Sequence, residues 1–217
     1  MVKNMEILVL AAHPDDEVLG MGATIKKLSK NNNVFLAILT DGASAQYNDK
    51  KMIGVRKKAC QKSSKFLGIK KISFIGYPDM KLDTIPHVEI NKKIESIMKE
   101  IKPEIVYSPS PNDLNKDHKI VFESAIVATR PHSSNVKQFF CYEIPGLQRE
   151  QFCPNVYTDI SKEFKSKIKA FNFYKTEIEN FPHPRSIKTL ESQAYLRGME
   201  SGLKMAEAFQ LIRMISN

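Results

Sequence analysis

The sequence predicts an α/β protein, a three-layer α/β/α sandwich in which helices cover both faces of a mostly parallel sheet. Short apolar runs, typical of strands buried on both faces, alternate with helix-like stretches along the chain. This alternation implies right-handed crossovers between parallel strands. With 217 residues, 42% of them hydrophobic, and no evident boundary or repeat, the chain is expected to form one domain over 1–217.

The expected strands are spaced so that helices fit between them. They span 7–11, 34–40, 72–75, 105–108 and 138–142, with a further strand at 156–160. Helical spacing of apolar residues follows the first strand up to Leu28, and helices are also expected at 162–174 and 189–215. The polar stretch 43–52 and the proline-containing stretch 180–186 are expected to be loops.

The run AAHPDDE, residues 11–17, lies where the first strand ends and a helix begins. Ligands bind outside the carboxyl ends of strands in open α/β sheets, so this turn is a candidate functional site. Acidic residues at a helix start also cap backbone N–H groups and suit the helix dipole. Capping alone would explain Asp15, Asp16 and Glu17, but it does not explain His13.

A second polar cluster, PSPNDLNKDH at 109–118, has the same placement. It follows the strand at 105–108 and precedes an apolar helix that is expected to begin near Asp117. Two strand ends of one sheet could thus bring His13, Asp16 and His118 together. Two imidazoles and one carboxylate, with a position left to water, form the ligand set of a catalytic zinc site. A lone histidine is more often a surface or capping residue, and it is the repeated context that favours His118 as a ligand.

These two clusters resemble the PIG-L (LmbE-like) family of zinc-dependent N-deacetylases. The resemblance continues through nearly the whole chain. The matching segments are TDG (40–42), LG (67–68), GYPD (76–79), YEIP (142–145), PNVYTDI (154–160), HPRS (183–186), RG (197–198) and AEAF (206–209), together with Arg56. The resemblance implies a Rossmann-like fold, one Zn²⁺ per subunit, and removal of the acetyl group from an N-acetylated amino sugar or glycoconjugate. The segments 41–42 and 154–160 look more like the bacterial surface-glycan branch, which implies a glycan-biosynthesis precursor.

By the same resemblance, His13, Asp16 and His118 hold zinc and Asp15 is the general base. Zinc lowers the pKa of its water toward ~7 and polarises an amide carbonyl. Asp15 need only lie within hydrogen-bond reach of that water. Its position next to Asp16 in a turn lets the two carboxylates point to different sides of the metal.

The residue that protonates the departing amine is left open by the sequence. Protonated Asp15 is one candidate. Asn115 stands where some relatives carry a histidine; it can donate a hydrogen bond to an oxyanion but cannot shuttle a proton. His183 is a further candidate acid, although a histidine between prolines is equally consistent with a loop residue that has no chemical role.

Arg56, Asp79 and Arg185 are the expected substrate-binding residues, again by resemblance. Arg56 is followed by two lysines, so it could instead belong to a solvated basic helix face. Asp79 follows a proline and also suits ordinary turn chemistry. Family members usually carry an acidic residue three positions after this arginine, where this chain has Ala59, which weakens any inference of an Arg–Glu pair within that helix.

Composition sets limits on partners and compartment. The net charge of +9 comes from lysines dispersed along helices, which predicts a solvated surface, although a basic rim could favour a phosphorylated or nucleotide-linked sugar. No motif indicates nucleic-acid or dinucleotide binding, and Gly20 and Gly22 are better explained by close packing. Three cysteines without a CxxC pair, no signal peptide and no long apolar run predict a soluble, cytoplasmic protein without a membrane span.

Two other functions are compatible with the same residues. A 2-His-1-carboxylate set also holds non-haem iron in oxygenases, although those enzymes usually have β-rich barrels. A noncatalytic sugar- or nucleotide-binding module is the second alternative. Since members of the resembled family often form trimers or hexamers, a homo-oligomer is also expected, with 183–186 as the segment that could complete a neighbour's site.

Overall fold

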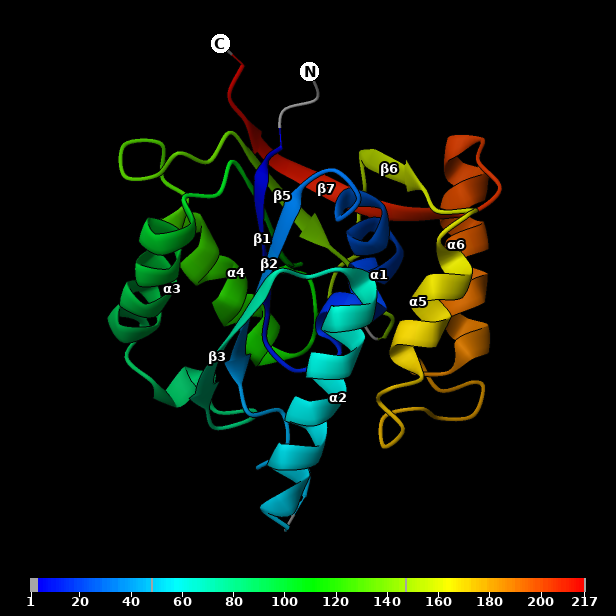
Figure 1. Ribbon diagram of the computed structural model, residues 1–217, viewed down its shortest axis with the longest axis horizontal. Helices are drawn as coiled ribbons and strands as arrows, with labels where there is room; N and C mark the ends of the chain where they lie inside the picture. The colour runs from blue at the N-terminus through cyan, green and yellow to red at the C-terminus, as the bar shows by residue number, and fades with distance from the viewer. Residues whose placement is uncertain (1–3, 48, 147, 217) are drawn as a thin grey trace.

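The computed structural model describes residues 4–47, 49–146 and 148–216, which form one seven-stranded sheet with helices on both faces (Figure 1). In chain order the elements are β1 (Glu6–Ala11), α1 (Asp16–Leu28), β2 (Asn33–Thr40), α2 (Lys51–Leu67), β3 (Lys71–Tyr77), the 3₁₀ turn η1 (Leu82–Thr84), α3 (His87–Ile101), β4 (Ile105–Pro109), α4 (Lys116–Ala128), β5 (Gln138–Tyr142), β6 (Val156–Asp159), α5 (Phe164–Phe171), α6 (Ile187–Ser201) and β7 (Ala206–Met214). The predicted fold class is confirmed.

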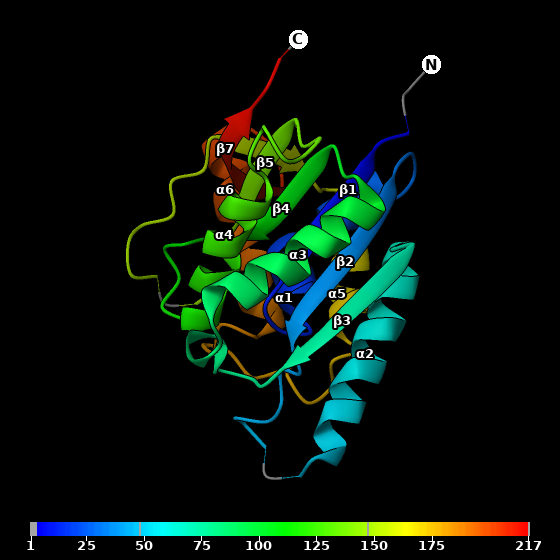
Figure 2. The same ribbon diagram turned by 90° about the vertical axis from the view of Figure 1, so that its left-hand side faces the viewer.

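The strands stand in the order β3-β2-β1-β4-β5-β7-β6. The first five are parallel, β7 runs antiparallel to β5, and β6 runs antiparallel to β7. From β1 the chain adds β2 and β3 on one side and then returns to place β4 on the other side, as Figure 2 shows. The sheet therefore has a topological switch point between β1 and β4, where α/β proteins of this kind bind ligands.

The central strand β1 separates two apolar layers. Its residues Ile7, Val9 and Ala11 belong to the core cluster beneath α1, α2, α5 and α6, whereas Leu8 and Leu10 belong to the cluster beneath α3 and α4. All five side chains are fully buried. A strand that alternates between two buried faces needs apolar residues at every position, which is why this segment reads as an unbroken apolar run. The two helical layers are seen on opposite sides of the sheet in Figure 1.

The prediction of a helix over 189–215 is wrong in its second half. Helix α6 ends at Ser201, Gly202 follows in the left-handed region with φ 70, and Ala206–Met214 forms β7. The apolar residues of this segment fit a helix locally, but β5 offers an unpaired edge, and pairing with it satisfies the backbone of β7. The helix expected at 162–174 is also shorter than predicted and spans Phe164–Phe171.

None of the helices among the described residues has the length and apolar character needed to cross a membrane. Cys60, Cys141 and Cys153 are all free, and the first two are buried.

Close packing at Gly20 gives a first testable prediction. A Cβ atom at this position would lie 2.2 Å from Cδ2 of Tyr142, whose hydroxyl donates to the Leu10 carbonyl at 2.8 Å. Gly20→Ala is therefore expected to lower the free energy of unfolding by about 1–3 kcal/mol, measured by urea denaturation. The matched control is Gly54→Ala in α2, where a Cβ meets nothing within 4 Å. That change should raise the free energy of unfolding by up to about 1 kcal/mol. If both substitutions changed the free energy of unfolding in the same direction, the packing argument would be wrong.

Candidate active site

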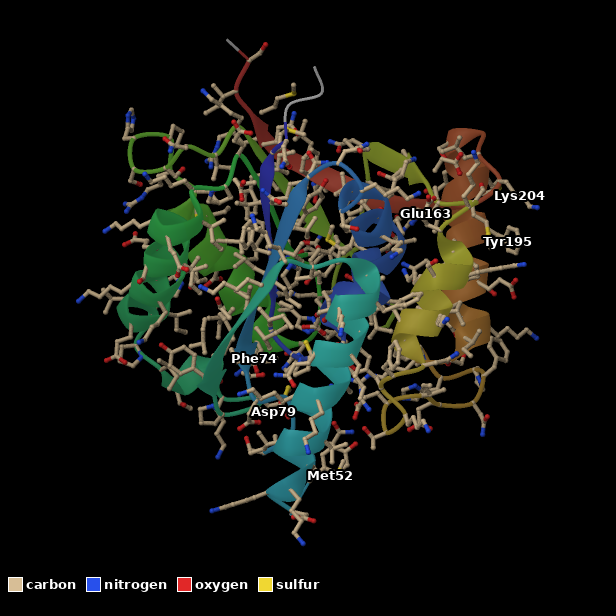
Figure 3. All side chains as sticks on the ribbon, viewed as in Figure 1. Met52, Phe74, Asp79, Glu163, Tyr195 and Lys204 are labelled. Atoms are coloured by element: carbon tan, nitrogen blue, oxygen red, sulfur yellow. The ribbon has the colours of Figure 1, made fainter. Side chains whose placement is uncertain are left out.

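The residues predicted to carry chemistry converge at the carboxyl ends of β1 and β4. His13 and Asp16 follow β1, and His118 lies in the first turn of α4, which follows β4. Asp79, two residues beyond β3, lies at the same end of the molecule as Met52 in the first turn of α2 (Figure 3). The switch point of the sheet thus places side chains from separate chain segments in one site.

Three potential ligand atoms face one another at the centre of this site. His13 Nδ1 lies 3.2 Å from His118 Nε2, and Asp16 Oδ2 lies 3.4 Å from each of these two nitrogens. His13 and His118 are 6% and 5% exposed and Asp16 is 2% exposed. Donors placed about 2.0–2.1 Å from one tetrahedral metal ion are separated by about 3.3–3.4 Å, so the spacing fits such an ion.

Neighbouring carboxylates fix which ring nitrogens are free to bind a cation. Asp113 Oδ2 lies 2.8 Å from His118 Nδ1, and Asp117 Oδ2 lies 3.2 Å from His13 Nε2. Because a carboxylate only accepts, each contact places the ring proton on that nitrogen and leaves a lone pair on the other. Two imidazole lone pairs and a carboxylate oxygen then face one another, and only a cation satisfies all three.

The electrostatics of the site agree with a cation at this point. Although burial works against a charged ring, the carboxylates of Asp16 and Asp113 raise the pKa of His118 to about 9. Burial likewise favours protonated Asp16, yet His118 and His13 hold the pKa of this carboxyl well below its usual range. The surroundings attract positive charge, and a divalent metal ion meets that demand with the histidines neutral.

Asp79 and Asp117 form a second acidic group around His13 Nε2, which lies 3.2 Å from an oxygen of each. Asp117 already accepts the backbone N–H groups of Met80 at 2.8 Å and Leu82 at 3.1 Å. These bonds occupy both of its oxygens. The group therefore orients His13 and secures the turn after β3, and its donors fit a second metal ion poorly.

Removal of the carboxylate behind His118 is expected to weaken metal binding. Asp113→Asn replaces an acceptor that fixes the ring with a group that can also donate, so metal affinity should fall by about 10–100-fold. Competition with a chromogenic zinc chelator measures this change directly. Asp83→Asn is the control, because Asp83 is an exposed acid that pairs with Lys116 at 3.1 Å. Equal affinities for the two variants would contradict the orienting role of Asp113.

Asp15 occupies the N-cap position of α1, but its side chain does not cap the helix. It precedes α1 with φ 125, in a region that side-chain-bearing residues rarely adopt, and its side chain makes no capping hydrogen bond. The turn is held instead by its neighbours: Asp16 accepts the N–H of His13 at 2.8 Å, and Glu17 accepts the N–H of Asp15 at 3.1 Å. Strain of this kind is typical of functional sites.

The carboxylate of Asp15 is fully buried, and neither oxygen has a hydrogen-bond partner among the described residues. Arg56 Nη2 lies 3.0 Å from Oδ2 without hydrogen-bonding geometry, and Arg185 Nε lies 3.9 Å away. Burial raises the pKa of Asp15, and the two guanidinium groups oppose this rise. A buried carboxylate with unpaired oxygens is suited to accept a proton.

Arg56 is 2% exposed, so the interpretation as part of a solvated basic face is wrong. It donates to the backbone carbonyls of Pro14, at 2.7 Å, and Gly42. The sequence contained no sign of its second carboxylate neighbour, Glu177, whose Oε2 lies 3.5 Å from Arg56 and 2.7 Å from Arg185. Arg56 therefore ties the AAHPDDE turn to the loop after β2.

A cleft of about 290 Å³ opens over these groups. It is lined by His13, Ala45, Gln46, Arg56, Asp79, Met80, Asn115 and Arg185. The set contains the three predicted substrate-binding residues and Asn115. The Asn115 side-chain oxygen caps α4 by accepting the Asp117 N–H at 2.9 Å, which leaves its Nδ2 to contact Met80 Sδ at 3.4 Å.

His183 does not line this cleft. Its side chain is exposed, and its Nδ1 accepts the backbone N–H of Arg185 at 3.1 Å. In this chain the residue orients the segment that carries Arg185.

Four acidic residues near the site were not assigned a site role from the sequence. Asp113 and Asp117 could have been recognised from the sequence as site residues, since both lie in the 109–118 cluster beside a proposed histidine ligand. Glu17 was explained as a helix cap, whereas it is fully buried and accepts the Tyr174 hydroxyl at 2.5 Å. Burial raises the pKa of Glu17 to about 7, although the Tyr174 bond opposes the rise. Glu177 had no local signal at all.

The fold and the site define an α/β protein with an open, cation-attracting 2-His-1-carboxylate centre at the switch point of its sheet. This architecture differs from the β-rich barrels expected of the iron oxygenases with a similar ligand set.

Comparison with known proteins gives the family. The PIG-L family model, described as GlcNAc-PI de-N-acetylase, matches residues 8–129, more than half of the chain. A diacetylchitobiose deacetylase of Thermococcus kodakarensis is 25% identical over 95% of this chain and 83% of its own length. A probable N-acetyl-alpha-D-glucosaminyl L-malate deacetylase of Bacillus cereus is 24% identical over 80% of this chain and 84% of its own. The solved N,N'-diacetylchitobiose deacetylase from Pyrococcus horikoshii has a TM-score of 0.81 and 26% identity, covering 95% of this chain and 83% of that one.

The chain belongs to the PIG-L family and is an N-deacetylase of that type.

Proposed function

We propose that this protein is a zinc-dependent hydrolase that removes the acetyl group from an N-acetylated amino sugar in glycan biosynthesis, releasing acetate and a free amine. The observation that carries the proposal is the convergence of three lone pairs, from His13, Asp16 and His118, beside the buried carboxylate of Asp15, whose oxygens accept no hydrogen bond among the described residues. The two relatives named above are described as deacetylases of diacetylchitobiose and of N-acetyl-alpha-D-glucosaminyl L-malate, which supports an acetylated sugar as the substrate. The three free cysteines favour a reducing compartment, and we place the enzyme in the cytoplasm.

In this proposal His13, Asp16 and His118 would hold one zinc ion. When bound, zinc supplies polarisation of the acetamide carbonyl and lowers the pKa of a coordinated water toward about 7.

Asp15 takes the proton from the attacking water, since it is the carboxylate beside the ligand set whose oxygens accept no hydrogen bond among the described residues. The departing nitrogen must be protonated before it leaves, because an amide nitrogen is a poor leaving group as an anion. We assign this return of the proton to Asp15 as well, because His183 is exposed and outside the cleft. Asn115 Nδ2 would exchange its weak contact with Met80 for a hydrogen bond to the developing oxyanion.

The three predicted substrate-binding residues would have different roles. Arg185, partly exposed at the cleft, and Asp79 would contact the sugar hydroxyls. Arg56 is buried more deeply and contacts Asp15, so its main contribution is to hold the base in place.

An acetate-release screen tests this proposal. The zinc-loaded protein is incubated with free, phosphorylated and nucleotide-linked N-acetylhexosamines, and acetate is measured by an enzyme-coupled assay. At least one of these compounds is expected to yield acetate in the absence of oxygen. Acetate release should stop when zinc is removed by a chelator and resume when zinc is added back. If zinc binds and no substrate in the screen yields acetate, the proposed function is wrong. Activity that requires iron and oxygen would indicate an oxygenase instead.

A further inference from the structure

The charge of the cleft is opposite to the charge of the chain. The protein carries a formal net charge of +9, yet seven carboxyl groups lie buried around the site, on Asp15, Asp16, Glu17, Asp79, Asp113, Asp117 and Glu177. Besides the rings of His13 and His118, the buried or half-buried cationic groups in contact with these carboxyl groups are the guanidinium groups of Arg56 and Arg185. A divalent metal ion would add two positive charges and still leave negative charge in excess. The excess persists whether or not Asp15 and Glu17 carry protons.

The two arginines are already engaged by carboxylates. Glu177, 1% exposed, lies between them and accepts from Arg185 Nη1 at 2.7 Å. Its other oxygen accepts from the Tyr47 hydroxyl at 3.0 Å and from Thr176 Oγ1 at 2.9 Å. Glu177 thus holds Arg185 in place and cancels one of the two positive charges of the cleft, while Asp15 opposes the other.

The exposed lining residues of the cleft carry no charge that could bind a phosphoryl group, and the partly exposed Arg185 is already paired with Glu177. Of the lining residues, the three exposed ones are Ala45, Gln46 and Met80, and all are neutral. A cleft of about 290 Å³ accommodates roughly one sugar ring, at the lower end of the volume range of ligand pockets. Substituents of that sugar would therefore lie against this neutral rim, above an acidic floor.

From this arrangement we infer that the substrate is an uncharged N-acetylamino sugar, either free or joined to another neutral sugar, and that Glu177 excludes phosphorylated and nucleotide-linked forms. The inference rests on the proposed function and adds the substrate class to it. Like charges brought together at a binding site discriminate strongly against the wrong ligand. The lysines spread over the surface do not alter this selection, because the discriminating charges are those buried at the site.

A comparison of kcat/KM values tests the substrate class. N-acetylglucosamine and its β-1,4-linked dimer are compared with N-acetylglucosamine 6-phosphate and UDP-N-acetylglucosamine. The better neutral substrate is expected to exceed both anionic ones by about tenfold or more. Equal or faster hydrolysis of an anionic substrate overturns the inference while leaving the deacetylase function intact. Absence of acetate from all four compounds counts against the proposed function itself.

Glu177→Gln tests the role of this residue, because it removes one buried charge and keeps nearly the same shape. The ratio of kcat/KM for neutral over phosphorylated substrate should fall about threefold or more, whatever happens to the absolute rate. Glu179→Gln is the matched control: it makes the same change of net charge two residues away, at an exposed side chain. Ratios that stay equal in the two variants contradict the assignment to Glu177.

A binding measurement keeps the inference testable if Glu177→Gln does not fold. Calorimetry on the metal-free wild-type protein compares two products, glucosamine and glucosamine 6-phosphate. The cationic amine is expected to bind at least about tenfold more tightly than its phosphorylated form, because the phosphate meets an acidic site. Tighter binding of the phosphorylated amine overturns the inference by a readout independent of turnover.

Discussion

Replacing Asp15 by asparagine is expected to lower kcat by about 10²–10⁴-fold while the protein still binds its metal. The amide keeps the size of the side chain but cannot accept a proton from water at neutral pH. No ligand atom is lost, because the three converging atoms belong to His13, Asp16 and His118. The measurement pairs turnover of the best substrate from the screen with metal content of the purified variant.

Asp16→Asn provides the contrasting control for this experiment. Asp16 supplies an oxygen to the ligand set and also accepts the N–H of His13, so its variant should lose metal along with activity. A circular dichroism spectrum and melting temperature establish that each variant is folded. If Asp15→Asn retained more than about a tenth of wild-type kcat, another group would have to serve as the base.

The fold and the meeting of His13, Asp16 and His118 could be predicted from the sequence because the patterns that indicate them are local. The five parallel strands appear as apolar runs, and each polar cluster follows one of them directly. The order of strands places β1 beside β4. The turns that follow these two strands therefore meet, although His13 and His118 are 105 residues apart in the sequence. Right-handed crossovers restrict the topology enough for that meeting to be foreseen.

The features that escaped prediction depend on contacts across the fold. β7 is a strand because β5 has a free edge with which it pairs, and the sequence of residues 206–214 does not indicate that this edge exists. Glu177 is important because it lies between two arginines, one from α2 and one from the loop before α6. The sequence shows it only as one acid in a polar stretch. The interpretation of Arg56 as a surface residue failed for the same reason, since its neighbours in sequence are exposed lysines.

Arg56→Met is expected to destabilise the fold more than Gly54→Ala or Lys57→Met, two other substitutions in α2. The guanidinium group is the shared neighbour of Asp15, at 3.0 Å, and Glu177, at 3.5 Å, and it donates to two backbone carbonyls. Removing one partner of a buried ion pair leaves uncompensated charge and costs about 3–5 kcal/mol. Urea denaturation of the metal-free protein measures this loss without interference from metal binding.

The adjacent Lys57→Met supplies the control, because Lys57 is exposed and its Nζ lies 4.9 Å from the centre of the Phe74 ring. Its loss should cost no more than about 1 kcal/mol. If both variants lost a similar amount of unfolding free energy, the carboxylates around Arg56 would have to rearrange freely. The turn that carries Asp15 would then not depend on Arg56. A large cost for Arg56→Met alone, with an accompanying fall in kcat, would instead identify the arginine as the group that holds the strained Asp15 turn in its active geometry.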